Sequence, residues 1–202
     1  MHILHIDCSP RDASHSRQMS AGLIERLLHL DPSASITRRD LGRKPLPHTQ
    51  AGYATALSSP NALAEAAQES LQLSEQLIRE VETADALVIG TPMNNFTVPS
   101  VLKAWIDQIL RVGRTMGVTA TGEKTGLLQD RPVYIAIASG GVFIGERANQ
   151  PDFLTPYLKA AFACIGLTSL QFVALQATAF MDDAQSATQR LALVTSMKIS
   201  TT

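Results

Sequence analysis

The feature that most constrains the fold is an alternation of short apolar runs with longer amphipathic segments. The runs that predict strands lie at residues 3–7, 36–40, 86–90, 133–138 and 169–175. The segments that predict helices lie at 16–30, 62–82, 99–111, 155–165 and, after a cap at Asp182 or Asp183, up to about 198. Strands that alternate with helices favour parallel βαβ units. We therefore expect one α/β domain over residues 1–202, with a doubly wound sheet of five parallel strands and helices on both faces.

The second predicted strand differs from the others in polarity. Its residues 37–40 are Thr-Arg-Arg-Asp, so we place it at an edge of the sheet. The run 86–90 is apolar throughout, which is typical of a central parallel strand. A proline-containing connection at 42–60 is predicted to be irregular, and such long loops are usually functional or mobile. Ligands of doubly wound sheets bind beyond the carboxyl ends of the strands, where the strand order reverses.

Composition narrows the class of protein. The 202 residues carry a formal net charge of -1, which argues against a chain built to bind nucleic acid. Two cysteines, Cys8 and Cys164, form neither a disulfide framework nor a zinc site, and the histidines have no metal-ligand spacing. No apolar run reaches the ~18 residues of a membrane helix, and the first residues do not resemble a signal peptide. We expect a cytoplasmic enzyme or carrier without a metal or a membrane contact.

The loop after the first strand has the composition of an anion site. Residues 8–16 place Ser9, Ser14 and Ser16 before and at the start of a predicted helix. Free backbone N–H groups and the positive end of the helix dipole favour a phosphate there, and hydroxyls add donors. In the alternative interpretation, Ser14 or Ser16 only caps the helix. The G-x-G-x-x-G pattern of dinucleotide sites is absent after this strand.

Two further loops follow predicted central strands. Residues 91–97 hold two asparagines and Phe96 after Pro92, and a loop of this kind suits the edge of a flat heterocycle. The alternative is an ordinary turn, because Asn tolerates unusual dihedral angles. The glycine pair at 140–141 leaves the backbone open to the close approach of a ligand. The alternative there is a plain turn after the strand.

Together the three loops resemble those of the FMN-dependent NADH-azoreductase family, also described as NADH:quinone oxidoreductases, of the flavodoxin-like superfamily. The matching segments are Ser9 with 14–16, the run 92–96 continuing to Pro99 and 102–103, then 139–141, 155–158 and 165–168. The run Pro-Met-Asn-Asn-Phe at 92–96 is the most specific of these segments. The resemblance extends over most of the chain.

The resemblance implies a bound FMN and a role for each loop. The residues that match the phosphate-binding loop are Ser9, Ser14, His15 and Ser16. The residues that match the loop along the isoalloxazine ring are Pro92, Met93, Asn94, Asn95 and Phe96. The residues that match the loop at the other ring edge are Ser139, Gly140, Gly141 and Val142. A sheet order of 2-1-3-4-5 and a homodimer with active sites shared between subunits are implied as well.

The resemblance also implies an activity. Hydride passes from NADH or NADPH through FMN to quinones and aromatic azo compounds, with ping-pong kinetics. The cofactor carries the chemistry, so no side chain is expected to act as a catalyst. The rival functions are a flavodoxin-type electron carrier, a general FMN reductase of the same fold, and a flavin-free member of it. Carriers are usually strongly acidic, and a net charge of -1 counts against that rival.

The chain departs from the family pattern in the expected substrate pocket. Residues 116–121 contain no aromatic side chain where relatives often carry one, and Cys164 stands where an aromatic is common. We expect Val118, Thr119 and Phe162 to line the pocket, with weaker stacking on small azo dyes. The alternative is that the 116–121 loop is turned outward.

The sequence motifs for other kinds of active site are weaker. Residues 122–125 resemble the end of a P-loop, but no strand precedes them and the glycine–lysine spacing is wrong. A Ser-His-Asp hydrolase has the necessary residue types but lacks the G-x-S-x-G elbow. Cys8 is expected to be a small buried side chain rather than a reactive thiol.

Overall fold

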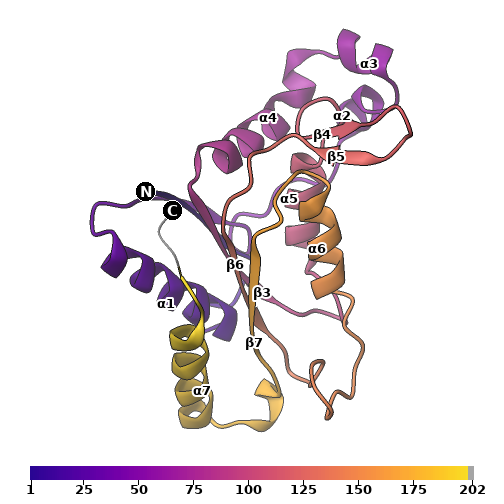
Figure 1. The fold of residues 1–202 in the computed structure, drawn as a ribbon. Helices are drawn as coiled ribbons and strands as arrows, with labels where there is room; N and C mark the ends of the chain where they lie inside the picture. Colours follow the sequence, from indigo (N-terminus) through magenta and orange to yellow (C-terminus); the bar gives the residue numbers. More distant parts are fainter. Residues whose placement is uncertain (200–202) are drawn as a thin grey trace.

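The computed structural model describes residues 1–199 and contains a five-stranded parallel sheet (Figure 1). The strands are β1 (His2–Asp7), β2 (Ser35–Asp40), β3 (Ala86–Pro92), β6 (Val133–Ala138) and β7 (Leu170–Leu175). Their order is β2-β1-β3-β6-β7, and every neighbouring pair is parallel. The predicted α/β class, the order 2-1-3-4-5 and the edge position of the polar strand are confirmed.

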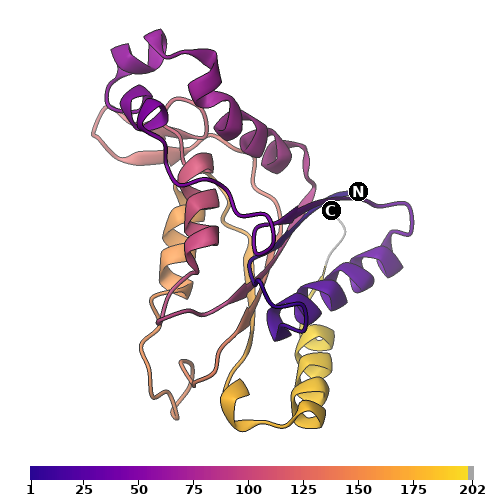
Figure 2. The ribbon, with the colours of Figure 1, turned by 180° about the vertical axis from the view of Figure 1, so that it is seen from behind.

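Helices cover both faces of the sheet, as expected (Figures 1 and 2). One face carries α1 (His15–Leu30) and α7 (Asp183–Ser196). The other face carries α4 (Gln68–Thr83), α5 (Ser100–Ile109) and α6 (Thr155–Ala163). Asp182 caps α7 in a capping box with Gln185, as one of the two predicted caps. Within residues 1–199, no helix is long and apolar enough to cross a membrane.

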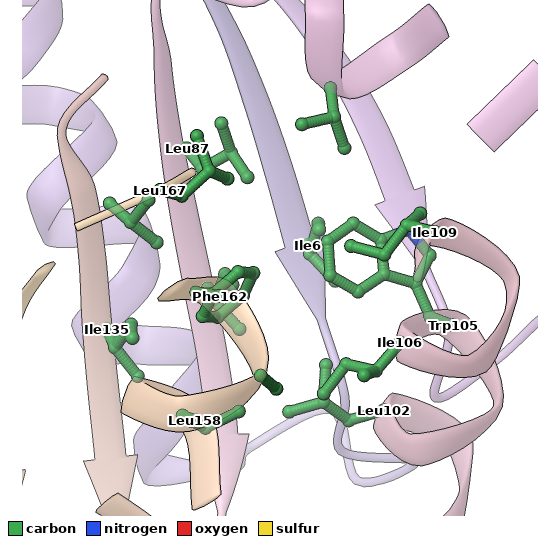
Figure 3. Packing of buried hydrophobic residues seen from close by; sticks show 14 of the residues in the cluster. Ile6, Leu87, Leu102, Trp105, Ile106, Ile109, Ile135, Leu158, Phe162 and Leu167 are labelled. Carbon is green, nitrogen blue, oxygen red and sulfur yellow. The ribbon is translucent and has the colours of Figure 1, made fainter. Parts of the chain in front are cut away.

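The larger core lies between the sheet and the helices α4, α5 and α6 (Figure 3). Leu87 and Ile89 of β3 point into it, whereas Val88 between them points to the α1 side, as the two-residue period of a strand requires. Trp105 of α5 and Phe162 of α6 are fully buried, with their ring centroids 6.3 Å apart. Burial of such large side chains stabilises the layer by about 1.5–3 kcal/mol each.

Gly90 at the end of β3 permits the close approach of α1. A Cβ atom at this position would lie 2.7 Å from both the Ser16 backbone oxygen and the Ser20 hydroxyl. Only a residue without a side chain therefore fits between the strand and the helix. The contact brings the first turn of α1 against the carboxyl end of the central strand, where the ligand site is expected.

The segment between β2 and β3 differs from the prediction. The connection at 42–60 contains the short helix α2 (Ala51–Ala56), and the single helix predicted at 62–82 is divided into α3 (Pro60–Glu65) and α4. The chain is extended at Ala66 and Ala67, with ψ angles of 137° and 135°. Two small side chains, one half-buried and one exposed, bury little apolar surface, so packing does not hold the helix continuous there.

A hairpin that the sequence did not predict follows α5. Its strands are β4 (Met116–Val118) and β5 (Lys124–Gly126), which pair antiparallel. Because α5 runs back from the end of β3 and β6 begins after the hairpin, the hairpin lies at the amino end of the sheet, near α2 (Figure 1). Three-residue strands have too little periodicity to be read from a sequence.

Four charged residues, which we call the amino-end clamp, hold the base of the hairpin against α4. They are Glu75, Glu82, Arg111 and Arg114. Arg114 donates to Glu75 Oε1 at 3.1 Å and to Glu82 Oε2 at 2.7 Å, and Arg111 donates to Glu75 Oε2 at 2.6 Å. The Arg114 guanidinium lowers the pKa of Glu75 to about 2 against burial, which opposes the shift. The clamp is therefore fully ionised at neutral pH.

Candidate functional site

The three predicted loops meet at the carboxyl ends of β1, β3 and β6. Cys8 N–H donates to Gly90 O at 2.9 Å, which ties the first loop to the end of β3. Met93 N–H donates to Ala138 O at 2.8 Å, which ties the second loop to the end of β6. The structure thus brings together the residues predicted to surround one ligand, at the place where parallel α/β sheets bind theirs.

The first loop holds three buried hydroxyl groups at the start of α1. Ser9, Ser14 and Ser16 are at most 6% exposed. The Ser14 and Ser16 hydroxyls contact each other at 3.0 Å, and Ser9 Oγ accepts from Arg11 N–H at 3.2 Å. Among the described residues, no carbonyl or carboxylate accepts from these hydroxyls. Buried hydroxyls usually have an acceptor, so this donor set points to a ligand.

The interpretation of Ser14 as a mere helix cap does not match the geometry. Ser14 occupies the cap position of α1, with an extended backbone, but its side chain makes no capping hydrogen bond. The first turn of a helix has N–H groups without an intrahelical partner, and a capping side chain normally takes one of them. These N–H groups of α1 are therefore available to an anion.

Arg17 supports this loop rather than supplying a free cation. Its guanidinium donates to Asp40 Oδ2 at 2.9 Å and to Ser9 O at 2.8 Å. The Asp40 hydrogen bond raises the pKa of Arg17, so this pair remains charged. The ring of His15, at the start of α1, contacts Arg190 of α7, a residue that the sequence analysis did not identify. No sequence signal links positions 175 residues apart.

The second loop contains a tight turn with unusual backbone angles. Asn94 and Thr97 exchange two backbone hydrogen bonds of 3.0 and 3.1 Å. Between them, Asn95 and Phe96 have φ angles of 47° and 72°. A positive φ is uncommon for a bulky aromatic residue and costs of order 1–3 kcal/mol. Such strain gathers at ligand sites, which favours the predicted ligand contact over an ordinary turn.

Two exposed aromatic side chains accompany this turn. Phe96 is 44% exposed and Phe153, before α6, is 60% exposed. Phe153 N–H donates to Phe96 O at 3.0 Å, so the two backbones are joined. Asp152 then accepts from the N–H groups of Leu154 and Thr155 at the start of α6. Phe153 thus projects from a fixed backbone beside the second loop, and the sequence analysis did not single it out.

The third loop is organised by Gln150, which sequence reasoning also missed. Its side-chain Nε2 donates to Ser139 Oγ at 2.8 Å and contacts Met93 Sδ at 3.3 Å. A Cβ atom at Gly141 would lie 2.6 Å from Gln150 Oε1. Val142 N–H donates to Asn149 Oδ1 at 3.2 Å. Gln150 therefore bridges the second and third loops, and Gly141 leaves it room to do so.

The predicted substrate-pocket residues do not lie with these loops. Phe162 is 0% exposed in the core against Trp105, so within a single chain it lies away from the predicted pocket (Figure 3). Its apolar neighbours on α5 and the sheet enclose it completely. Val118 in β4 and Thr119 after it lie beyond the far end of α5, a ten-residue helix about 15 Å long. Val118 is 56% exposed there.

Among the described residues, the structure offers no accessible site for a Ser-His-Asp hydrolase, a reactive cysteine or a metal ion. His5, Asp7 and Ser20 do lie together, with Ser20 Oγ donating to Asp7 Oδ1 at 2.8 Å, but Ser20 is 0% exposed beneath α1. No substrate reaches that hydroxyl. Cys8 is 1% exposed, and burial raises the pKa of its thiol far above the usual value, as expected for an inert side chain. The described residues contain no cluster of metal-ligating side chains.

Comparisons with known proteins agree with this architecture. A family model described as a flavodoxin-like fold matches residues 1–195. An FMN-dependent NADH:quinone oxidoreductase of Pseudomonas fluorescens is 46% identical over 92% of this chain and 89% of its own. One of Burkholderia lata is 45% identical over 90% and 87%. The solved FMN complex of an FMN-dependent NADH-azoreductase from Bacillus anthracis has a TM-score of 0.81 at 25% identity, covering 96% and 95% of the two chains. The chain therefore belongs to the flavodoxin-like fold family and, within it, to the FMN-dependent NADH:quinone oxidoreductases.

Proposed function

We propose that this protein is an FMN-dependent oxidoreductase that takes hydride from NADH or NADPH and reduces quinones and aromatic azo compounds. The observation that carries the proposal is the set of unused donors at the start of α1, next to a strained second loop. The names of the relatives supply the cofactor and the substrate class.

The donor set fits the phosphate of FMN. A phosphate dianion accepts several hydrogen bonds, and the first loop offers three buried hydroxyls together with the N–H groups of an uncapped helix start. The loop contains no lysine and one arginine, the exposed Arg11, so we assign most of the phosphate binding to neutral donors and the helix dipole. Ser9, Ser14 and Ser16 are the residues that we assign to the phosphate.

The second and third loops are assigned to the ring of the cofactor. When bound, the isoalloxazine supplies the two-electron chemistry that side chains lack. The backbone of 93–96 is held rigidly by its paired hydrogen bonds, so it presents fixed N–H and C=O groups to a ring edge. Backbone N–H groups of 139–142 are proposed to stabilise negative charge at the opposite edge, as an oxyanion hole does. These residues position the ring and exclude water, and none needs to form a covalent bond.

We further propose a homodimer in which each active site uses both subunits. Exposed apolar side chains occur at both ends of the sheet: Phe96 and Phe153 beside the loops at the carboxyl end, and Val118 and Leu127 on or directly after the hairpin at the amino end. A single chain keeps these groups apart, and in the proposed dimer a two-fold axis would place the hairpin of one copy over the loops of the other. Val118 and Thr119 would then line the partner's pocket. Nicotinamide and acceptor would use this pocket in turn, which predicts ping-pong kinetics.

The purified protein tests the proposed function directly. We expect a yellow protein that contains FMN, sediments as a dimer, and oxidises NADH or NADPH rapidly only when a quinone is added. A yellow protein that does not react with either nucleotide would indicate an electron carrier. Release of reduced FMN as the product would indicate a general FMN reductase. A colourless protein that takes up no added FMN would contradict the proposal entirely. Cell fractionation tests the expected cytoplasmic location.

A further inference from the structure

Arg190 of α7 lies against the residue that begins the proposed phosphate loop helix. Its Nη1 atom is 2.8 Å from His15 Nδ1, and both residues are only partly exposed. The two helices are fixed to each other elsewhere as well. Arg26 of α1 donates to Met197 O at 2.9 Å, and Val194 packs 3.2 Å from the position of a Cβ at Gly22. The contact therefore belongs to a rigid helix pair.

The chemistry of this contact determines the protonation of His15. A guanidinium group only donates hydrogen bonds, so His15 Nδ1 accepts and carries no proton. The proton of the neutral ring then resides on Nε2, which has no partner among residues 1–199. Burial, followed by the charges of Arg190 and Arg11, lowers the pKa of His15, while Asp183 opposes them. His15 is consequently a neutral donor through Nε2 at pH 7.

Arg190 also brings a positive charge close to the start of α1, where we propose that the phosphate binds. Arg17 is committed to Asp40 and to the Ser9 carbonyl, whereas Arg190 makes its one described side-chain hydrogen bond to a neutral imidazole. A phosphate dianion at the start of α1 would gain from a nearby positive charge that no carboxylate neutralises. Asp183, at the start of α7, is an acidic group whose charge opposes the lowering of the pKa of His15.

We propose that Arg190 is a positioning residue for the FMN phosphate: it holds His15 as a neutral Nε2–H donor and adds a positive charge beside the loop. The inference rests on the proposed function, and it assigns to α7 a role in selecting phosphorylated flavin. It predicts that the protein distinguishes FMN from riboflavin partly through a residue that does not touch the phosphate-binding serines.

The first test compares two ligands that differ only in the phosphate. Apoprotein is titrated with FMN and with riboflavin, and dissociation constants are measured for wild type, Arg190→Met, Arg190→Lys and Lys198→Met. Arg190→Met should weaken FMN about tenfold and leave riboflavin unchanged, with Arg190→Lys in between. Lys198→Met removes the same charge from an exposed position beyond α7 and should change neither constant. Unchanged FMN binding, or equal weakening of both flavins, in Arg190→Met would overturn the inference.

The second test asks whether Arg190 acts through His15. In a His15→Ala background, Arg190→Met should weaken FMN by less than about threefold, because the positioning contribution is already lost. A full tenfold loss in that background would overturn the positioning role. Nitrogen-15 NMR of the apoprotein should show His15 as the Nε2–H tautomer in wild type and as a mixture in Arg190→Met. The same Nε2–H signal in both proteins would contradict the inference. Failure of the wild-type protein to bind FMN would instead refute the proposed function.

Discussion

The two ends of the sheet use polar groups in opposite ways. At the amino end, the clamp pairs every one of its four charges within the protein, and each carboxylate accepts from a guanidinium. At the carboxyl end, buried hydroxyls contact one another, a helix start has no cap bond, and an aromatic residue adopts a positive φ. Paired groups stabilise the fold, whereas unpaired donors and strain point to a ligand. We infer from this difference that the amino end of the sheet stabilises the fold and that the carboxyl end binds the ligand.

Breaking the clamp should have the largest effect, and it should fall on stability. In Glu75→Ala, the Arg111 guanidinium, whose side chain is 8% exposed, loses its carboxylate. We expect a loss of about 2–3 kcal/mol in the free energy of unfolding of the apoprotein, measured by urea denaturation. Arg79→Met is the matched control, because that side chain is 72% exposed and its pair with Glu75 contributes little. A Glu75→Ala protein as stable as wild type would show that the clamp does not stabilise the fold.

The pH dependence of the free energy of unfolding also tests the clamp. Because Arg114 holds the pKa of folded Glu75 near 2, below its usual 4.5, the unfolded state binds a proton first as the pH falls. The stabilisation is therefore complete above about pH 5 and is lost between pH 4.5 and 2. Glu75→Ala should lose less stability than wild type over that interval, and parallel curves would contradict the assignment.

Two buried serines of α1, four residues apart, sharpen the contrast. Among residues 1–199, the Ser16 hydroxyl has a hydrogen-bond partner only in Ser14, whereas the Ser20 hydroxyl contacts Asp7, His5 and the Arg17 carbonyl. Ser16→Ala should weaken FMN binding by about 1–3 kcal/mol with little change in stability. Ser20→Ala should lower stability by a similar amount and leave the FMN dissociation constant unchanged. An unchanged constant in Ser16→Ala would place the phosphate elsewhere.

Gly141 tests whether the third loop borders the ring or only accommodates Gln150. Gly141→Val should purify with little FMN, because its side chain would enter the ligand space or displace Gln150. The double variant Gly141→Val with Gln150→Ala removes the clash with Gln150, because the shorter side chain at 150 leaves room for the valine. We expect FMN content to stay low in the double variant. Full loading there would mean that Gln150 alone explains the glycine.

The smallest expected effect concerns the hairpin. Val118→Tyr adds an aromatic side chain to an exposed position that we assign to the partner's pocket. Stacking contributes about 0.5–1.5 kcal/mol, so the Michaelis constant for a small azo dye should fall by about two- to tenfold. The constant for a compact quinone should change less. If the substitution changes neither Michaelis constant, the hairpin lies outside the pocket.

The sequence was sufficient for the sheet and for the loops at its carboxyl end. Apolar runs such as 86–90 and the polar stretch 37–40 determine which strands are central and which is at the edge, because burial follows residue type directly. The Pro-Met-Asn-Asn-Phe run indicated the second loop. These signals are local, so one sequence contains them.

The sequence was insufficient where long-range packing decides. Arg190 contacts His15, which lies 175 residues earlier in the chain, and Gln150 contacts Ser139 across an irregular segment. No spacing in the sequence reveals such contacts. The family resemblance suggested Phe162 for the pocket, and only the tertiary structure shows that its ring is buried against Trp105 within the single chain. The helix at 62–82 divides at two alanines that continue the helical pattern but bury too little.

Amide hydrogen exchange in the first turn of α1 shows whether this turn binds the phosphate of FMN. We propose that the backbone N–H groups of residues 15–17, which no capping side chain takes, bind this phosphate. Saturating FMN should slow exchange at these N–H groups, whereas saturating riboflavin, which lacks the phosphate, should protect the second and third loops but not this turn. Equal protection of residues 15–17 by both flavins, or none by FMN, would contradict the account.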